Sequence, residues 1–448
     1  MRCLPVKSAS LWLSPLLLSA CGALPGAPDA VEQAAPVAQA CPAGIDAQTR
    51  CLAGRDSAGA YYLIALPKDW SGHLVLHAHG GPDLGPPTAQ RVEADLQRWS
   101  VMPRAGYAWA GSSFRQGGVA VRAAAEDTER LRSIFVRHVA KPRLTVLHGQ
   151  SWGANVAAKA AETFTAGKPY DGVLLTSGVL GGGTRSYDFR LDLRVVYQYL
   201  CANHPRPDEP AYPLWQGLPE GGTMTRADLA QRVDACLGVQ RPAAERSAEQ
   251  ARKLKTLVDV IRIPEGQVIA HLAWGTFHFR DIATHRSGGG NVFGNVGVRY
   301  SGSPDDAALN AGVLRYATDP AALARFAADA DLDGRIPVPV LTVHGIHDAT
   351  AFVELESAFA ATMARAGRAD ALVQTFSDDR EHSYLSDATY VGLLANLEAW
   401  LAQGRKPTPL SVSEACHAAR VRFPSSCRIV PDFRPAPLEA RVPARAQP

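Results

Sequence analysis

One serine in this chain lies between small residues, where an apolar stretch changes into an alanine-rich one. The segment LTVLHGQSWGANVAAKAA, residues 144–161, predicts a strand, a tight turn and a helix that begins just after Ser151. A sharp strand-to-helix turn of this kind exposes the serine side chain. A serine hydroxyl is a poor nucleophile until a neighbouring base takes its proton, so the sequence should also supply that base.

Two later residues have the chemistry to activate this serine. Asp348 and His382 each follow a predicted apolar strand. A histidine acts as a general base near neutral pH, and a carboxylate orients its imidazole and stabilises the cationic form. We therefore predict a catalytic triad of Ser151, Asp348 and His382. His347 is an alternative catalytic histidine, and Asp348 could instead cap the helix that follows it.

The elements around these residues alternate between strand and helix. Predicted strands span residues 61–66, 73–80, 106–113, 143–149, 170–178, 338–345 and 371–376. Predicted helices span residues 119–140, 152–164, 351–367 and 384–402. Apolar strands that alternate with helices indicate a mostly parallel sheet with helices on both faces.

With its flanking strand and helix, the Gly149-Gln150-Ser151-Trp152-Gly153 turn resembles the nucleophile turn of the α/β-hydrolase superfamily. The chain order Ser, Asp, His and the stretch HGGP at residues 79–82 strengthen the resemblance, which covers roughly residues 55–180 and 336–402. It implies an α/β-hydrolase sheet with an inserted cap domain. In families with the HGGP pattern, the residue before the proline and the residue after the nucleophile donate N–H groups to the oxyanion. Here these are Gly81 and Trp152.

The pattern of predicted strands and helices suggests the boundaries of the domains. Residues 181–335 lack clean alternation and are rich in Gly, Pro, Arg and aromatic residues, which is why we interpret them as the cap. We expect a signal peptide at 1–20, an Ala/Pro-rich tether at 21–40, hydrolase core at 41–180 and 336–403, the cap or lid at 181–335, and a surface tail at 404–448.

The N-terminus has the features of an export signal. Two basic residues precede a short apolar run, and Leu18-Ser19-Ala20-Cys21 resembles the lipobox of bacterial lipoproteins. The resemblance implies that Cys21 is lipidated and anchors the protein to a membrane. Gly22 favours the outer membrane, facing the periplasm or the exterior. The alternative is a plain secretory signal with an incidental cysteine.

Composition and cysteine content restrict the partners. A net charge of +3 gives no reason to expect nucleic acid. Six cysteines beyond Cys3 and Cys21 suggest disulfides in an oxidising compartment, and although 15 pairings are possible, nearest neighbours would join 41 to 51, 201 to 236 and 416 to 427. No zinc spacing is present.

One acidic stretch imitates a metal site. Residues 329–336, DADLDGRI, copy the opening of a calcium loop, but Val340 occupies the position of the bidentate glutamate. We interpret the stretch as a turn. The sequence predicts no metal and no cofactor.

The triad indicates acyl transfer and leaves the acyl group open. The leading hypothesis is a serine hydrolase that cleaves small-molecule carboxylic esters through an acyl-enzyme. An exopeptidase acting on short peptides is the second, because HGGP, GQSWGA and HGIHD resemble motifs of prolyl iminopeptidase-like enzymes. Gln150, the stretch SSFRQGG and the sequence Glu-His-Ser around His382 depart from that pattern, and the chain has no room for the propeller of prolyl-oligopeptidase-like enzymes. A non-catalytic binding lipoprotein on a hydrolase scaffold is the third.

Overall fold

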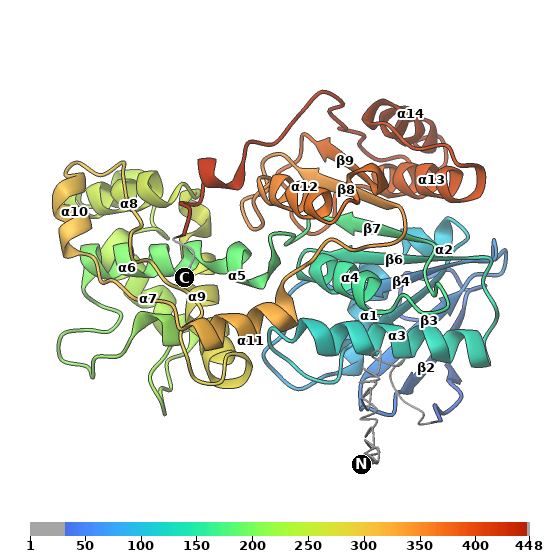
Figure 1. Ribbon diagram of the computed structural model, residues 1–448, viewed down its shortest axis with the longest axis horizontal. Coiled ribbons are helices and arrows are strands. Elements are labelled where there is room, and N and C mark those ends of the chain that lie inside the picture. The colour runs from blue at the N-terminus through green and yellow to red at the C-terminus, as the bar shows by residue number, and fades with distance from the viewer. Residues whose placement is uncertain (1–31, 446–448) are drawn as a thin grey trace, which may run out of the picture.

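A mixed sheet forms the centre of the computed structural model, which describes residues 32–445 (Figure 1). Within these residues the sheet has nine strands in the order β1-β2-β3-β5-β4-β6-β7-β8-β9. The strands are β1 (Val37–Gln39), β2 (Arg50–Arg55), β3 (Tyr61–Leu66), β4 (His73–Ala78), β5 (Ala108–Ser112), β6 (Leu144–Gln150), β7 (Gly172–Thr176), β8 (Val340–Gly345) and β9 (Leu372–Ser377). The pairs from β5 through β9 are parallel and the remaining pairs antiparallel, which confirms the mostly parallel sheet.

Helices cover both faces of this sheet, as predicted. Side chains alternate between the faces of a strand, so Leu74 and Leu76 of β4 enter one hydrophobic core and Val75 enters the other. The first core is closed by α3 (Val121–His138), α4 (Trp152–Thr163) and α12 (Leu355–Arg365). The second is closed by α1 (Ala89–Arg98), α2 (Val101–Arg104), α13 (Asp387–Gln403) and α14 (Pro409–Ala419). The strand order and the two-sided cover are those of the α/β-hydrolase fold.

All the residues between β7 and β8 lie outside the sheet. Seven α-helices of this segment form a body to one side of it (Figure 1): α5 (Gly182–Tyr187), α6 (Phe189–Cys201), α7 (Arg226–Leu237), α8 (Ala248–Ile261), α9 (Val268–Asp281), α10 (Asp306–Gly312) and α11 (Pro320–Ala330). The shorter helices of the described chain are η1 (Leu214–Gln216), η2 (Ala243–Glu245), η3 (Glu265–Gln267), η4 (Ile282–Arg286), η5 (Ala369–Ala371) and η6 (Leu438–Ala440). Below, "cap" denotes residues 181–335.

The beginning of the fold differs from the prediction. The tether was expected to reach residue 40, yet β1 pairs with β2, and the Gln33 side chain is buried and bonded to Ser57. All three β1 side chains are exposed, so the strand is held by its backbone and leaves no apolar pattern in the sequence. The predicted signal peptide and Cys21 lie outside the described residues.

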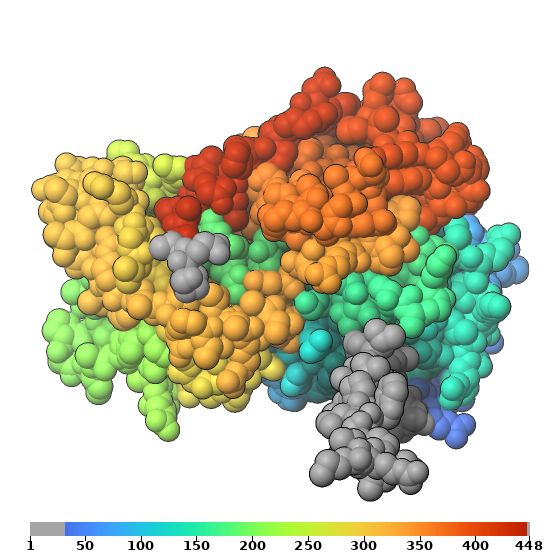
Figure 2. Space-filling model, in the orientation of Figure 1, coloured from blue at the N-terminus to red at the C-terminus, as the bar shows by residue number. Residues whose placement is uncertain are grey.

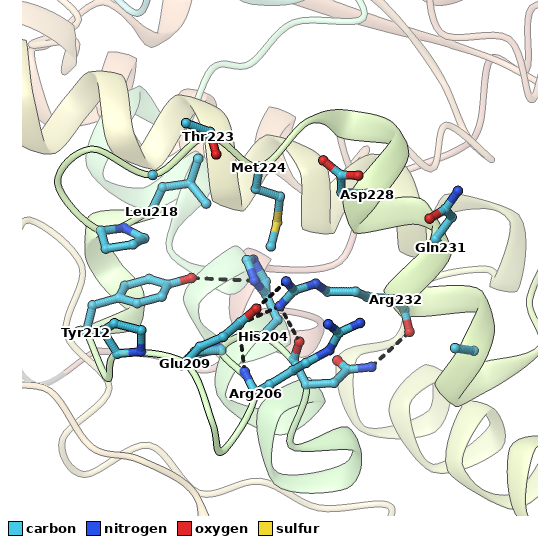
Figure 3. A pocket seen from close by; sticks show the side chains of 16 residues that line it. His204, Arg206, Glu209, Tyr212, Leu218, Thr223, Met224, Asp228, Gln231 and Arg232 are labelled. Carbon is cyan, nitrogen blue, oxygen red and sulfur yellow. Dashed lines mark hydrogen bonds and ion pairs between the residues drawn. The ribbon is translucent and has the colours of Figure 1, made fainter.

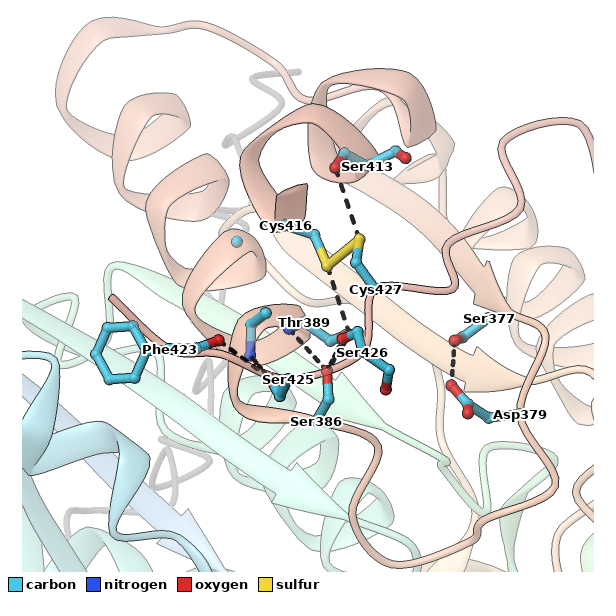
Figure 4. The surroundings of a disulfide bond; sticks show 12 residues. Ser377, Asp379, Ser386, Thr389, Ser413, Cys416, Phe423, Ser425, Ser426 and Cys427 are labelled. Atoms are coloured by element: carbon cyan, nitrogen blue, oxygen red, sulfur yellow. Dashed lines mark hydrogen bonds between the residues drawn. A yellow bond between two sulfur atoms is a disulfide. The ribbon is translucent and has the colours of Figure 1, made fainter. Parts of the chain in front are cut away.

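The predicted surface tail is also partly wrong. Its first part forms α14, which packs on α13 and buries Val412 and Cys416. Figure 4 shows the disulfide between Cys416 and Cys427, with the Ser386 hydroxyl of the α13 N-cap donating to the Ser426 carbonyl close by. A Pro/Arg-rich composition suggested a solvated surface, but the apolar residues of one short helix are enough to complete the second core.

The last described residues cross from the hydrolase core to the cap. In this segment, residues 438–445, which we call the strap, Leu438 and Val442 are buried. Arg441 binds Glu354 of the hydrolase core at 3.0 Å and donates to the Arg262 carbonyl of the cap at 2.9 Å. Arg445 binds Asp192 of α6 at 2.7 Å. The strap is drawn in red over the cap helices in Figures 1 and 2.

Three disulfides confirm the nearest-neighbour pairing of the cysteines. Cys41 is joined to Cys51, Cys201 to Cys236, and Cys416 to Cys427. The second of these connects α6 to α7 inside the cap. No helix among residues 32–445 is both long and apolar enough to span a membrane.

Candidate active site

Ser151 lies in the turn between β6 and α4, in a backbone conformation that is rare for a residue with a side chain. Its φ of 57° and ψ of −121° turn the chain sharply from strand to helix. A Cβ atom at Gly149 would lie 2.1 Å from the Gly153 carbonyl oxygen, and one at Gly153 would lie 2.0 Å from the Ala78 oxygen. Glycines at these two positions therefore let the turn close tightly beneath the serine.

The three predicted triad residues meet at the ends of three strands. His382 Nε2 lies 2.7 Å from Ser151 Oγ, and His382 Nδ1 lies 2.7 Å from Asp348 Oδ2. Ser151 follows β6, Asp348 follows β8 and His382 follows β9. Parallel strands bring these loops to the same edge of the sheet. This is the hydrogen-bond chain by which a base activates a serine.

Asp348 is held from several directions. Its Oδ1 accepts the N–H groups of Thr350 and Ala351 at 2.8 and 3.1 Å, so the carboxylate caps the following turn while Oδ2 faces His382. Burial alone would raise the pKa of Asp348, but the attraction of His382 and hydrogen bonds from His344 and His382 keep it well below its usual range. The carboxylate is therefore ionised throughout the neutral range.

A buried histidine behind Asp348 was not predicted. His344 Nε2 lies 3.4 Å from Asp348 Oδ2 and 2.9 Å from the Ala351 carbonyl, while Nδ1 lies 3.3 Å from Glu356 Oε1. Burial opposes protonation of His344, but hydrogen bonds to the two carboxylates raise its pKa to about 10. The sequence offered one weak signal for this contact: His344 lies in an apolar strand, twelve residues before Glu356 in the following helix.

The alternative histidine, His347, points to a different partner. Its Nε2 lies 3.0 Å from Asp378 Oδ1, and both side chains are exposed, by 47% and 66%. His347 makes no hydrogen bond to Ser151 in the part of the chain described. The geometry therefore brings His382, and not His347, to the serine.

The two predicted oxyanion donors flank Ser151. Gly81 has a φ of +70°, which favours glycine, and neither its N–H nor that of Trp152 has an acceptor among the described residues. Arg91 fixes this loop, because its Nη2 donates to the Gly80 carbonyl and lies 2.9 Å from His79 Nδ1. Two N–H groups left free beside a nucleophile can stabilise a developing oxyanion.

Gln150, which departs from the exopeptidase pattern, has a contact of its own. Its Nε2 donates to the His382 carbonyl at 3.1 Å. A Cβ atom at Gly80 would lie 2.0 Å from Gln150 Oε1, so the glutamine also fills the space beneath the HGGP loop. Gln150 thus connects the loop that carries His382 to the HGGP loop.

A cavity of about 240 Å³ opens onto Ser151 and lies between the hydrolase core and the cap. Its walls are Gly80, Gly81, Pro82, Arg91, Arg98, Gln150, Ser151, Trp152, Val179, Tyr187, Arg190, Trp274, Thr350, His382 and Ser383. The cap supplies the Tyr187 and Trp274 rings to this wall, whereas its Phe279 and Tyr197 rings are buried in the first hydrophobic core.

A larger cavity of about 790 Å³ lies within the cap (Figure 3). None of its lining residues belongs to the triad. Figure 3 shows the Arg232 and Glu209 side chains pointing toward each other, with Arg232 Nη1 2.7 Å from Glu209 Oε2. Two of the charged side chains that line this cavity are thus paired with each other.

The acidic stretch that imitates a calcium loop has a structural role. Asp329 accepts the N–H groups of Val121 and Arg122 at the start of α3, both at 3.1 Å. Asp331 accepts the N–H and the hydroxyl of Thr184. These carboxylates fasten the end of the cap to the hydrolase core and to α5. No group of potential metal ligands occurs among residues 32–445.

Comparisons with known proteins identify distant similarities of fold. No protein-family model matches the chain, and no curated protein matches it. An esterase from Aspergillus oryzae is 13% identical with a TM-score of 0.43, covering 80% of this chain and 81% of its own. Feruloyl esterase B from Aspergillus oryzae is 14% identical with a TM-score of 0.42, covering 83% and 86%. The rice cell wall degrading esterase LipA from Xanthomonas oryzae is 13% identical with a TM-score of 0.35, covering 74% and 83%. At such low sequence identities and TM-scores, the similarity supports no conclusion about the activity or the substrate of this protein.

Proposed function

We propose that this protein is a serine hydrolase that cleaves small carboxylic esters through an acyl-enzyme. The observation that carries the proposal is the continuous chain from Ser151 Oγ through His382 to Asp348, with 2.7 Å at both links. Gly81 and Trp152 also line the cavity with Ser151, and their N–H groups have no acceptor among residues 32–445. A nucleophile, a base and an oxyanion site are the parts that acyl transfer requires.

The reaction follows from these positions. His382 takes the proton of Ser151 as Oγ attacks the ester carbonyl, and the Gly81 and Trp152 N–H groups hold the oxygen that becomes negative. His382 then returns the proton to the departing alkoxide, which leaves as an alcohol. Water then attacks the acyl-enzyme as His382 takes its proton. His382 gives that proton to Ser151 Oγ as the bond between Oγ and the acyl group breaks, which releases the carboxylic acid and restores the serine. Asp348 stabilises the imidazolium at each step.

The charge of the cavity favours an ester over the substrate of an aminopeptidase. Such a substrate carries a free ammonium group, which a carboxylate in the enzyme would have to bind. The residues that line the cavity include Arg91, Arg98 and Arg190 but no aspartate or glutamate. An ammonium group would be repelled there, because like charges in a desolvated site are strongly unfavourable.

Labelling with a fluorophosphonate probe tests the proposal directly. We expect wild-type protein to be labelled, and Ser151→Ala and His382→Ala to remain unlabelled. The labelled enzyme should hydrolyse short 4-nitrophenyl esters and leave aminoacyl-naphthylamides intact, with Ser151→Ala lowering kcat by about 10⁶-fold. Cleavage of the amides would establish the exopeptidase alternative. A folded wild type that takes no label and cleaves neither substrate would establish the binding-protein alternative.

We also propose that the protein is an exported lipoprotein of the cell envelope, anchored through Cys21. The lipobox-like tetrapeptide that ends at Cys21 supports this, and three disulfides suit an oxidising compartment. Metabolic labelling with a palmitate analogue should mark wild type and spare Cys21→Ser. Equal labelling of both proteins would contradict the anchor.

A further inference from the structure

Arg190, at the start of α6, is a buried cation beside the candidate active site with no carboxylate partner among the described residues. The residue is 5% exposed and lines the same cavity as Ser151. Its Nη1 donates to the Ser186 carbonyl at 3.3 Å, and Nε has no hydrogen-bond partner. Nη2 has no hydrogen-bond partner among the described residues and is not completely buried.

Aromatic rings hold this guanidinium in place. Its central carbon lies 4.4 Å from the ring centroid of Trp274, 4.5 Å from that of Phe189 and 5.5 Å from that of Tyr187. Burial lowers the pKa of Arg190 to about 9, so the group still carries its charge at neutral pH. Aromatic faces offset part of the cost of burying a cation, but they leave its N–H groups free to bind an anion.

The nearest acids in the sequence are already engaged. Asp188 pairs with Arg185 and lies 3.4 Å from Arg445 Nε. Asp192 binds Arg445 Nη2 at 2.7 Å and accepts the Tyr300 hydroxyl at 2.7 Å. Both carboxylates are two residues from Arg190 and so face other sides of the helix, and neither forms an ion pair with it among the described residues. The positive charge of Arg190 is left for something that enters the cavity.

The rest of the cavity has the same sign of charge. Arg91 also lines it but is paired, with Nε 3.2 Å from Asp95. Arg98 lines it as an exposed side chain. With no acid in the wall, the cavity attracts anions and discriminates against cations.

We propose that Arg190 binds a carboxylate on the substrate, so that the preferred substrates are small esters carrying a second, ionised carboxyl group. This inference rests on the proposed function, because it assigns the substrate class of the same site. An arginine fork matches a carboxylate in geometry, and the neighbouring Trp274 and Tyr187 rings would contact the apolar part of the ester. A cavity of about 240 Å³ limits that part to a short chain or one ring.

Matched esters measure the preference. Monomethyl glutarate and methyl valerate differ in the carboxylate on the acyl side, whereas 4-carboxyphenyl butyrate and phenyl butyrate differ on the alcohol side. We expect kcat/KM to favour the anionic ester of at least one pair by about 10- to 100-fold, the range of a charge-assisted hydrogen bond. If the acyl-side pair shows the preference, Arg190 binds the acyl part of the substrate. If the alcohol-side pair shows it, Arg190 binds the alcohol part. Equal or lower kcat/KM for both anionic esters would overturn the proposal.

Variants assign the preference to Arg190. In Arg190→Gln the ratio of kcat/KM for the anionic over the neutral ester should fall by about 10-fold or more, and Arg190→Lys should restore part of it. Arg226→Gln is the matched control, since Arg226 also lies over an aromatic ring, 5.0 Å from the Phe277 centroid, but does not line the cavity. Ratios unchanged in Arg190→Gln would overturn the assignment.

Binding to the inactive serine variant separates this inference from the proposed function. Calorimetry on Ser151→Ala should detect monomethyl glutarate and not methyl valerate, and addition of Arg190→Lys should weaken that binding. If wild type proves inactive while Ser151→Ala still binds the anion through Arg190, the proposed function fails and the anion site stands. If active wild type shows no preference and Ser151→Ala binds neither ester, the anion site fails alone.

Discussion

His344 Nε2 lies 3.4 Å from Asp348 Oδ2, and neither side chain is exposed to solvent. On its other side, His344 faces Glu356, whose Oε2 accepts Thr342 Oγ1 and Gln374 Nε2. A buried cation between two carboxylates fixes Asp348 opposite His382. If the proposed mechanism holds, we expect His344 to act as a positioning residue, because its contacts are Asp348, Glu356 and the Ala351 carbonyl.

His344→Gln should lower kcat by about 10²-fold, because a misplaced Asp348 no longer aligns the imidazole of His382. Loss of a positive charge beside the triad should also move the acid limb of the kcat/KM profile to higher pH. His347→Gln, at the exposed histidine three residues on, is the control and should do neither. A pH–rate profile of His344→Gln that matches wild type in shape and height would show that His344 serves stability alone.

Asp348→Asn should reduce kcat by about 10⁴-fold, as expected when a triad carboxylate becomes an amide that no longer holds the correct tautomer of the histidine. Asp378→Asn is a close control, since Asp378 pairs with His347 at 3.0 Å in the neighbouring loops. Steady-state hydrolysis of 4-nitrophenyl butyrate measures both. Comparable losses in the two variants would remove Asp348 from the triad.

Glu162→Gln should make stability less dependent on pH. Glu162, 3% exposed at its side chain, accepts the Gly334 N–H at 2.6 Å, and burial raises its pKa to about 7. A folded-state pKa above the unfolded value means that the contribution of Glu162 to stability is full below about pH 4.5 and is lost as pH rises toward 7. The uncharged glutamine keeps the acceptor.

The free energy of unfolding should therefore be higher in Glu162→Gln than in wild type at pH 8, by on the order of 2 kcal/mol, and nearly equal at pH 4.5. Urea unfolding at the two pH values gives the difference. Glu220→Gln, at an exposed position of the cap, should show no such change. A Glu162→Gln difference that is the same at both pH values would mean that the carboxyl is not protonated in the fold.

Cys201→Ser with Cys236→Ser should destabilise the cap more than Cys416→Ser with Cys427→Ser destabilises the C-terminal segment. The sequence separations are 35 and 11, so loss of loop closure costs about 4 and about 3 kcal/mol in the chain-entropy model. Thermal unfolding and limited proteolysis compare the two double variants. A reversed order would place the stabilisation in native packing and not in the unfolded chain.

Much of the hydrolase core could be predicted because its signals are local. Apolar strands such as β4 and β8 are buried along their whole length, and the turn around Ser151 needs small residues within five positions. Elements with weak local signals were missed. β1 exposes all its side chains, and β2, RCLAGR, contains no β-branched residue. In α1 the buried residues Val92, Asp95 and Leu96 have helical spacing, but the helix is short and mostly polar and was not predicted.

The residues of the candidate site also differ in how well the sequence predicted them. Ser151, Asp348 and His382 each follow a recognisable strand, and the structure brings them within hydrogen-bond distance. Arg190 and His344 were not predicted, because their significance comes from what lies around them in space. In the sequence, an arginine in a cap helix looks like any surface arginine, and only the structure shows that Trp274 and Phe189 enclose its guanidinium beside the cavity.

The strap adds a further link between the two parts of the molecule. The cap is joined covalently to the rest of the chain at two places, after β7 and before β8. The strap contacts both sides of this boundary, because Arg441 binds Glu354 of the hydrolase core and the Arg262 carbonyl of the cap, and Arg445 binds Asp192 of α6. A hinge movement of the cap about its two covalent junctions would therefore have to break the contacts of Arg441 and Arg445 first.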